Sequence, residues 1–319
     1  MGKLAFVFPG QGSQTVGMGK DIYDEVPEAG ELFRAADEKL GFDLSDLIFN
    51  GPETELKMTA NTQPALLTTS YALYRIFASK GITPDYFAGH SLGEYTALTA
   101  AGILSFEDAV ATVRARGLFM EQAVPGGQGA MAAVLGAERS ALAELCAAIT
   151  SEGHLVELAN INCPGQIVVS GSRAGVDALV ERVKEAGGKR AIPLEVSGPF
   201  HSSLMRSAAE RLEETLGGIQ YADASVPVVV NVTAQPVHKG AEIPALLTQQ
   251  VYSPVLWEDS VRWLIEQGVD TFVEIGPGSV LTGLLKKIDK NVRGLNVNSL
   301  ESLEQVAATL KDGIEAFNP

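Results

Sequence analysis

Short apolar strands alternate with amphipathic helices along the first part of the chain, and this alternation restricts it to few folds. Leu4 to Phe8 is an uninterrupted apolar run, typical of a strand buried on both faces of a parallel sheet. Pro9 to Gly12 end this run in a glycine-rich loop, and a helical region follows to about Leu47. Further predicted elements are a helix at 64–80, a strand at 85–90 and helices at 92–101 and 106–124. Such alternation predicts a doubly wound α/β fold.

A different order of elements follows the glycine-rich link PGGQG at 125–129. The pattern predicts strands at 130–135, 156–161, 166–170 and 190–196, with helices at 138–151 and 175–186. This β-α-β-β-α-β order is the ferredoxin-like pattern. We therefore predict a small subdomain at 127–196, inserted into a large α/β subdomain formed by 1–126 and 197–319. In its second part we expect strands at 226–232 and 271–275 and helices at 257–267 and 280–288.

Composition excludes several classes of protein. A net charge of −15 argues against a nucleic-acid-binding protein, which would normally be basic. Cys146 and Cys163 form no C-x-x-C pair, and no His/Cys cluster has zinc spacing, so we predict no metal site and a reducing compartment. The first apolar run stops at Pro9, too early for a signal peptide, and no apolar stretch approaches the ~20 residues of a membrane span. We expect a cytoplasmic monomer that binds neither membranes nor nucleic acid.

The pentapeptide GHSLG at 89–93 is a G-x-S-x-G motif. Chance gives this motif in roughly one chain in five of this length and glycine content, so the pattern alone is weak. Its context is stronger, because a predicted strand enters it and a predicted helix leaves it, as in a nucleophile elbow. There the helix N-terminus favours negative charge near Ser91. The alternative is that Ser91 only caps the helix.

A serine nucleophile needs a base, and the chain has four histidines. His90 adjoins Ser91 in a tight turn and cannot easily reach back to its hydroxyl. His154 and His238 lie in polar turns by composition. His201 follows a predicted strand, where α/β sheets place site residues, and is the predicted base. The alternative for His201 is an ordinary surface histidine.

No acidic third member of a triad stands out between Ser91 and His201. The acids considered there have positions typical of helix faces or turns: Glu107, Glu121, Glu152 and Asp177. This departs from the Ser, acid, His order of α/β-hydrolases. A carbonyl or an amide side chain is the alternative group for orienting the imidazole.

Acyl transfer needs N–H donors aimed at the developing oxyanion. Leu92, directly after the nucleophile, supplies one N–H, and the loop at 10–12 is a candidate for the second. The alternative for this loop is dinucleotide binding, but its G-x-G-x-x-T spacing fails the G-x-G-x-x-G fingerprint.

Arg116 lies near the apolar face of the helix predicted at 106–124. That face is formed by Phe106, Ala109, Val110, Val113, Met120 and Val124. Arg116 projects within about 60° of its centre, whereas Arg114 projects about 100° away. An arginine turned toward the core needs an anion. That anion is either an internal carboxylate or the carboxylate of a substrate, which suits the planar guanidinium.

Several longer motifs occur in a fixed order along the chain: FPGQGSQ at 8–14, NTQPA at 61–65, GHSLGE at 89–94, RG at 116–117, GPFHS at 198–202, QVYSPV at 250–255 and EIGPG at 274–278. Together they resemble the malonyl-CoA:acyl carrier protein transacylase family of bacterial fatty-acid synthesis. The resemblance runs nearly end to end, and the combination is far more specific than any one motif.

The resemblance implies a hydrolase-like core with a parallel sheet and an inserted ferredoxin-like subdomain. It implies Ser91 as nucleophile, His201 as base and Arg116 as the partner of the malonate carboxylate. It implies the N–H groups of Gln11 and Leu92 as the oxyanion hole. It also implies Gln250 near the site, with a carbonyl orienting the base. Phe200 resembles the malonyl-selective form of the motif, in which the ring crowds the α-methyl of methylmalonate, an effect worth only ~1–3 kcal/mol.

The implied reaction is a ping-pong transfer of malonyl from malonyl-CoA to the phosphopantetheine thiol of acyl carrier protein. No resident cofactor is implied, because CoA belongs to the substrate and phosphopantetheine to the partner. Candidate docking residues for the carrier are Lys189, Arg190, Lys286, Lys287, Lys290 and Arg293, which are otherwise ordinary solvated residues. The alternatives are a trans-acting polyketide acyltransferase, a serine acyl hydrolase and an inactive carrier-binding module.

Overall fold

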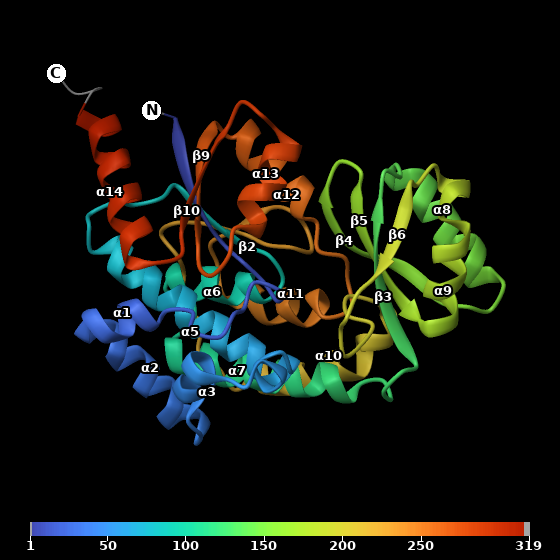
Figure 1. Ribbon diagram of the computed structural model, residues 1–319, viewed down its shortest axis with the longest axis horizontal. Coiled ribbons are helices and arrows are strands. Elements are labelled where there is room, and N and C mark those ends of the chain that lie inside the picture. Colours follow the sequence, from blue (N-terminus) through green and yellow to red (C-terminus); the bar gives the residue numbers. More distant parts are fainter. Residues whose placement is uncertain (1, 316–319) are drawn as a thin grey trace.

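A six-stranded sheet and a four-stranded sheet organise the chain in the computed structural model, which describes residues 2–315 (Figure 1). The six-stranded sheet has the order β10-β9-β1-β2-β7-β8. Its strands are β1 (Lys3–Phe8), β2 (Tyr86–Gly89), β7 (Val228–Val229), β8 (Pro236–Val237), β9 (Val269–Ile275) and β10 (Arg293–Val297). All neighbours are parallel except β7 and β8. This sheet confirms the α/β class.

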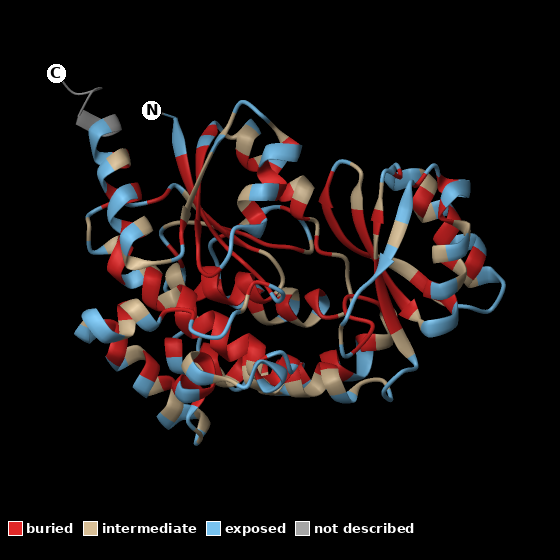
Figure 2. Cartoon of the chain, viewed as in Figure 1, coloured by how far each residue is buried: buried red, intermediate tan, exposed pale blue. Residues whose placement is uncertain are grey.

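Strand β1 lies in the middle of this sheet, and helices cover both faces of the sheet (Figure 2). Its side chains are therefore buried on both sides, which accounts for the apolar run. Phe6 and Phe8 belong to the apolar core that includes α5 (Thr59–Ala78) and α6 (Leu92–Ala100). Ala5 and Val7 point the other way, into the core formed with α12 (Trp257–Glu266) and α13 (Val280–Ile288). Alternate side chains therefore enter different cores, which explains why the run is apolar without interruption.

The remaining helices surround the six-stranded sheet and its covering helices. Helix α7 (Phe106–Gln122) packs against α5, and both contact α2. The other elements are α1 (Lys20–Glu25), α2 (Pro27–Leu40), α3 (Leu44–Asn50), α4 (Glu53–Leu56), α10 (Arg206–Gly217), α11 (Ile243–Gln250) and α14 (Leu300–Glu315). Short 3-10 turns lie at Val183–Ala186, Ser203–Met205 and Gly240–Glu242. No described helix combines the length and apolar character needed to cross a bilayer.

The four-stranded sheet is antiparallel, with the order β4-β5-β3-β6. It consists of β3 (Gly129–Leu135), β4 (Val156–Cys163), β5 (Gln166–Ser172) and β6 (Arg190–Pro193), with helices α8 (Arg139–Ser151) and α9 (Arg173–Arg182). Ala130, Ala132 and Val134 face the core shared with these helices. Met131 points the opposite way and joins the core of the larger sheet. The alternation along β3 thus aims Met131 at the junction of the two sheets.

Three predicted elements have different bounds in the structure. The strand predicted at 190–196 ends at Pro193, and the next residues line a cavity instead. The strand predicted at 226–232 is paired only at Val228–Val229, because the chain then turns so that Asn231 contacts the loop before α6. The helix predicted from Pro64 starts at Thr59, although proline removes one internal hydrogen bond. Strands β8 and β10 carried too few apolar residues to be predicted.

Candidate active site

Ser91 occupies the tight turn between β2 and α6, as the motif predicts. Its backbone has φ 52° and ψ −106°, a conformation that costs about 1–3 kcal/mol for a residue with a side chain. Glycine is required on both sides: a Cβ on Gly89 would lie 2.0 Å from the carbonyl carbon of Gly93, and one on Gly93 would lie 2.1 Å from the oxygen of Phe8. The turn therefore holds the serine hydroxyl out at the start of α6.

His201 lies directly against Ser91. Its Nε2 is 2.8 Å from Ser91 Oγ, and its Nδ1 is 2.9 Å from the carbonyl oxygen of Gln250. Because a carbonyl only accepts, Nδ1 carries the proton and Nε2 is left to accept the serine hydroxyl. Burial, and next the charge of Arg116, lower the pKa of His201 to about 3. The imidazole is therefore neutral at pH 7, as a general base must be.

The other histidines have the positions expected of them. His154 and His238 are exposed. The Nε2 of His90 lies 2.8 Å from Asn162 Oδ1, and its ring packs on Trp257. None of the hydrogen bonds of His201 among residues 2–315 involves a carboxylate. The described site therefore contains a serine, a histidine and a main-chain carbonyl in place of an acid.

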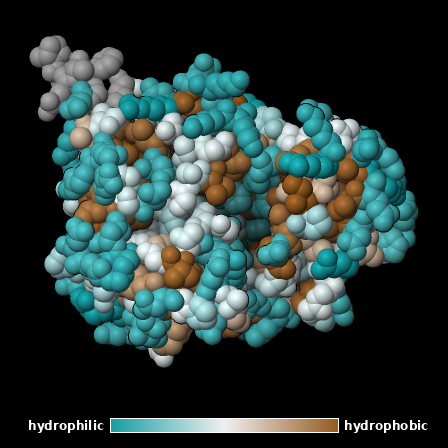
Figure 3. All heavy atoms as spheres, in the orientation of Figure 1, coloured by the Kyte–Doolittle hydropathy of each residue, from teal (hydrophilic) through white to brown (hydrophobic). Residues whose placement is uncertain are grey.

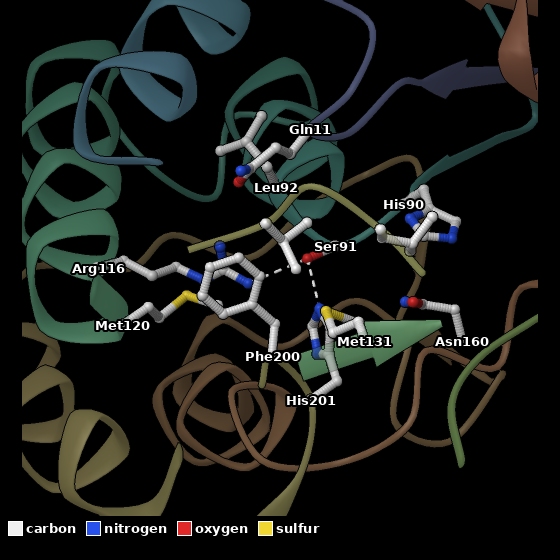
Figure 4. Close-up of a pocket in the computed structure, with 12 residues that line it drawn as sticks. Gln11, His90, Ser91, Leu92, Arg116, Met120, Met131, Asn160, Phe200 and His201 are labelled. Carbon is white, nitrogen blue, oxygen red and sulfur yellow. Dashed lines mark hydrogen bonds between the residues drawn. The ribbon is translucent and has the colours of Figure 1, made fainter. Parts of the chain in front are cut away.

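Arg116 is only 1% exposed, and its guanidinium points at Ser91 (Figure 4). It donates to Gln63 Oε1 at 2.8 Å, Gln250 Oε1 at 3.0 Å and Ser91 Oγ at 3.1 Å. Among the ion pairs of the described chain, none includes Arg116. Arg114 turns away, as predicted, to Asn61. The hydrogen-bond partners of the buried cation are thus two amides and a hydroxyl, and no carboxylate of the described residues pairs with it directly, which leaves the guanidinium able to bind a substrate anion.

A buried acid that the sequence analysis did not consider lies one turn after Ser91. Glu94 is fully buried, and its Oε2 accepts the N–H of Asn231 at 2.6 Å. Burial raises its pKa to about 7, against the opposing effects of Asn231, Gln250 and Arg116. The sequence signal that could have identified Glu94 was its position in the first turn of α6. Residues 92–99 of this helix are all buried, so an acid at position 94 is buried with them.

Two main-chain N–H groups border the space in front of Ser91. Gln11 and Leu92 both line this cavity, and their N–H groups take part in none of the hydrogen bonds found within residues 2–315. The loop that carries Gln11 is fixed to the turn at 89–93 that carries Ser91, because the N–H of His90 donates to the oxygen of Phe8 at 3.1 Å. These two groups meet the requirement for free donors near the reacting carbon.

The cavity is walled by apolar side chains from α7, from β3 and from the loop after β6, and Figure 3 shows the surface hollowed between the two parts of the molecule. Apart from the polar residues above, it is lined by Met120, Met131, Leu194, Val196 and Phe200, with Asn160 as a further polar group. Figure 4 shows Phe200 among the side chains that line this cavity together with Arg116, Ser91 and His201. No cluster of three or more His, Cys, Asp or Glu side chains in the described part is arranged to hold a metal ion.

Comparison with known proteins decides the family. The model for the acyl transferase domain matches residues 5–314. The malonyl CoA-acyl carrier protein transacylase of Bacillus subtilis (strain 168) is 56% identical over 312 residues, which cover 98% of each chain. The chain belongs to the malonyl CoA-acyl carrier protein transacylase family. The transacylase of Staphylococcus aureus (strain MRSA252) is 49% identical over 304 residues, covering 95% of this chain and 98% of that relative.

Solved structures of transacylases have the same fold as this one. The acyl carrier protein S-malonyltransferase of Vibrio cholerae has a TM-score of 0.93 at 44% identity, covering 95% of this chain and 99% of that chain. A type II PKS acyl-carrier protein in complex with its malonyl-transacylase gives 0.93 at 42% identity, covering 96% and 99%. In the present transacylase, every predicted site residue lies at or beside one cavity. Glu94 and Asn231 are the neighbours of this site that the sequence analysis missed.

Proposed function

We propose that this transacylase transfers a malonyl group from malonyl-CoA to the phosphopantetheine thiol of acyl carrier protein in fatty-acid biosynthesis. The observation that carries the proposal is a buried arginine whose hydrogen-bond partners within residues 2–315 are all neutral, and which donates to the same serine hydroxyl that contacts a neutral histidine. A plain acyl group needs no such cation, whereas malonate has a free carboxylate for it.

In the first half of the proposed cycle, Ser91 Oγ attacks the thioester carbonyl carbon while His201 Nε2 takes the hydroxyl proton. The oxyanion is stabilised by the N–H groups of Gln11 and Leu92. The C–S bond then breaks, and His201 returns the proton to the leaving CoA sulfur. Malonyl-Ser91 remains, with its carboxylate on Arg116.

In the second half, the carrier's phosphopantetheine thiol attacks the ester carbonyl and gives its proton to His201. The bond to Ser91 Oγ breaks, and the same proton returns to the serine. CoA and phosphopantetheine are parts of the two substrates, so no step of this cycle needs a resident cofactor. The main-chain carbonyl of Gln250 keeps the imidazole in the required tautomer throughout.

The two sheets correspond to the two subdomains that we infer. A hydrolase-like subdomain at 1–126 and 197–319 supplies Ser91 and Arg116, and a ferredoxin-like subdomain at 127–196 supplies one wall of the cavity. The strand order β4-β5-β3-β6 supports the ferredoxin-like assignment. Two buried free cysteines support a reducing, cytoplasmic location. All proposed catalytic groups come from one chain, in accord with a monomer.

Phe200 is proposed to favour malonyl over methylmalonyl groups. It lines the same cavity as Arg116, and we expect a malonyl carboxylate held by the arginine to place the α-carbon near the ring. The steric cost of one methyl group is about 1–3 kcal/mol, so the expected result is a preference and not complete exclusion.

The proposed function is tested by asking whether the malonyl group is transferred to the thiol of the carrier or to water. The protein is mixed with malonyl-CoA and holo acyl carrier protein, and the intact mass of the carrier is followed over time. We expect the carrier to gain one malonyl group, and the apo carrier, which lacks the thiol, to gain none. Release of free malonate with an unchanged carrier mass would instead identify a serine acyl hydrolase. An equal or faster reaction with a polyketide carrier would favour the trans-acting alternative.

A basic surface at the junction of the two sheets is the proposed docking site for the acidic carrier. Lys286 and Lys287 are exposed near the end of α13, and Lys287 Nζ donates to Gln166 Oε1 of β5 at 3.1 Å. Lys189 and Arg190 are also exposed, and Lys189 lies against Gly136, whose N–H donates to Gly165 beside Gln166. The two basic clusters therefore adjoin, which supports one continuous surface.

The double variant Lys286→Glu/Lys287→Glu should raise the Michaelis constant for the carrier roughly tenfold, because rim charges steer association. The Michaelis constant for malonyl-CoA should stay unchanged. The control is Lys39→Glu/Lys311→Glu, which changes net charge equally at exposed lysines of α2 and α14. Initial rates at varied carrier concentration measure the effect. Equal Michaelis constants in the two double variants would remove this docking proposal.

A further inference from the structure

Asn231 forms hydrogen bonds to two points of the turn that carries Ser91, although it belongs to a distant part of the chain. It is fully buried and lies just after β7. Its side-chain Nδ2 donates to the oxygen of Gly89 at 2.7 Å, and its Oδ1 accepts the N–H of Ser91 at 2.8 Å. One amide therefore pairs with the main chain at Ser91 and at the residue two positions before it, and only His90 lies between these two points.

Glu94 fixes the main chain of Asn231 in turn. Its Oε2 accepts the Asn231 N–H at 2.6 Å, and its own N–H donates to the oxygen of Ser91 at 3.0 Å. Gln250 joins the same network, since its Nε2 donates to Ser91 O at 3.0 Å and to Asn231 Oδ1 at 3.3 Å. The strand before Ser91, the helix after it and the residue that orients His201 are thus connected through one asparagine.

The chemistry of this bridge selects an asparagine. Ser91 keeps a positive φ of 52°, and such strain persists only where the surroundings fix the backbone. At Asn231 the side chain must donate to one peptide and accept from another, which aspartate and leucine of similar shape cannot do. Loss of the Asn231 amide would leave the N–H of Ser91 and the oxygen of Gly89 without this partner, which costs free energy.

We propose that Asn231 is a positioning residue that holds the backbone of Ser91 in its strained conformation, and that Glu94 holds Asn231. The hydroxyl of Ser91 then stays within reach of His201, and the N–H of Leu92 stays directed at the cavity. The proposal rests on the proposed function, because its effect is on formation of the malonyl-serine. Neither residue is among those that line the cavity, so binding of malonyl-CoA should not depend on them.

The test compares four variants with the native protein: Asn231→Ala, Glu94→Ala, Glu94→Gln and Thr99→Ala. Rapid-quench intact mass measures the rate of acylation by malonyl-CoA and its dependence on malonyl-CoA concentration, and thermal melting measures stability. Thr99→Ala is the matched control, because Thr99 is buried in α6 like Glu94 and its hydroxyl donates to Tyr95 O of the same helix. It should lower the melting temperature but leave the acylation rate within about twofold.

Asn231→Ala should lower the maximal acylation rate about 10²-fold, with the half-saturating malonyl-CoA concentration unchanged, since a misplaced nucleophile loses rate and not binding. Glu94→Ala should also lower this rate, and Glu94→Gln, which keeps an acceptor for Asn231, should recover at least tenfold over Glu94→Ala. The pair at Glu94 decides the matter if Asn231→Ala does not fold.

Three results would overturn the inference. They are a native acylation rate in Asn231→Ala, a loss of rate matched by a proportional loss of malonyl-CoA binding, and equal rates in Glu94→Ala and Glu94→Gln. Failure of the native protein itself to form an adduct would instead refute the proposed function, so the two failures are distinguishable.

Discussion

Ser91→Ala is expected to abolish the malonyl adduct and to lower transfer to the carrier by about 10⁴- to 10⁶-fold, as for other enzymes that lose a covalent nucleophile. The physical reason is that no other hydroxyl lies within hydrogen-bonding distance of His201 Nε2 among the described residues. Without Oγ, the thioester carbon has no nucleophile beside the base, although the cavity and Arg116 remain. Intact mass after mixing with malonyl-CoA, together with the rate of CoA release, measures the loss.

Ser151→Ala is the matched control, because Ser151 is an exposed serine at the end of α8 and does not line the cavity. This variant should form the adduct at the native rate. The melting temperature of Ser91→Ala should stay close to that of the native protein, because removing Oγ breaks no main-chain hydrogen bond of the turn. An adduct that persists in Ser91→Ala would assign the covalent chemistry to another residue.

Arg116→Ala should reduce the preference for malonyl-CoA over acetyl-CoA by about 10²-fold, the value of a charge-assisted pair with a carboxylate. The preference, taken as the ratio of the two kcat/KM values, is more informative than either value alone. Arg116 also donates to Ser91 Oγ, and loss of this contact affects both substrates equally. The ratio cancels this shared effect and leaves the interaction with the free carboxylate.

Arg114→Ala provides the control for Arg116, since it removes the same charge from the same helix on a side that contacts Asn61 and the ring of Phe42. Its malonyl preference should equal that of the native protein. Arg116→Lys should recover only part of the preference, because a lysine keeps the charge but not the planar pair of donors. A strong malonyl preference that survives in Arg116→Ala would show that the carboxylate is recognised elsewhere.

Local patterns were sufficient to predict the elements that meet at Ser91. An apolar strand, two obligatory glycines and a helix start are all written within a few residues of one another, so the turn was predictable from sequence. Arg116 was predictable because helical periodicity shows which face turns inward. His201 followed by elimination among four histidines, without any signal for its partner.

Long-range partners could not be predicted in this way. Asn231 contacts residues 140 and 142 positions earlier in the chain, and nothing in its neighbourhood indicates that its side chain reaches the turn. Gln250 was expected near the site only through family resemblance. The two-residue strands β7 and β8 depend on pairing with strands already in place, a tertiary effect that overrides local propensity.

Because a main-chain carbonyl orients His201, this interaction responds to mutation differently from one made by a side chain. A carboxylate in that role can be lost by a single codon change, whereas every residue placed at position 250 brings the same carbonyl oxygen. The hydrogen bond to His201 Nδ1 is therefore preserved by any side-chain substitution that leaves the main chain at the end of α11 in place. An alanine scan would not detect it, and only insertions, deletions or a proline that displaces this stretch of main chain would expose its contribution.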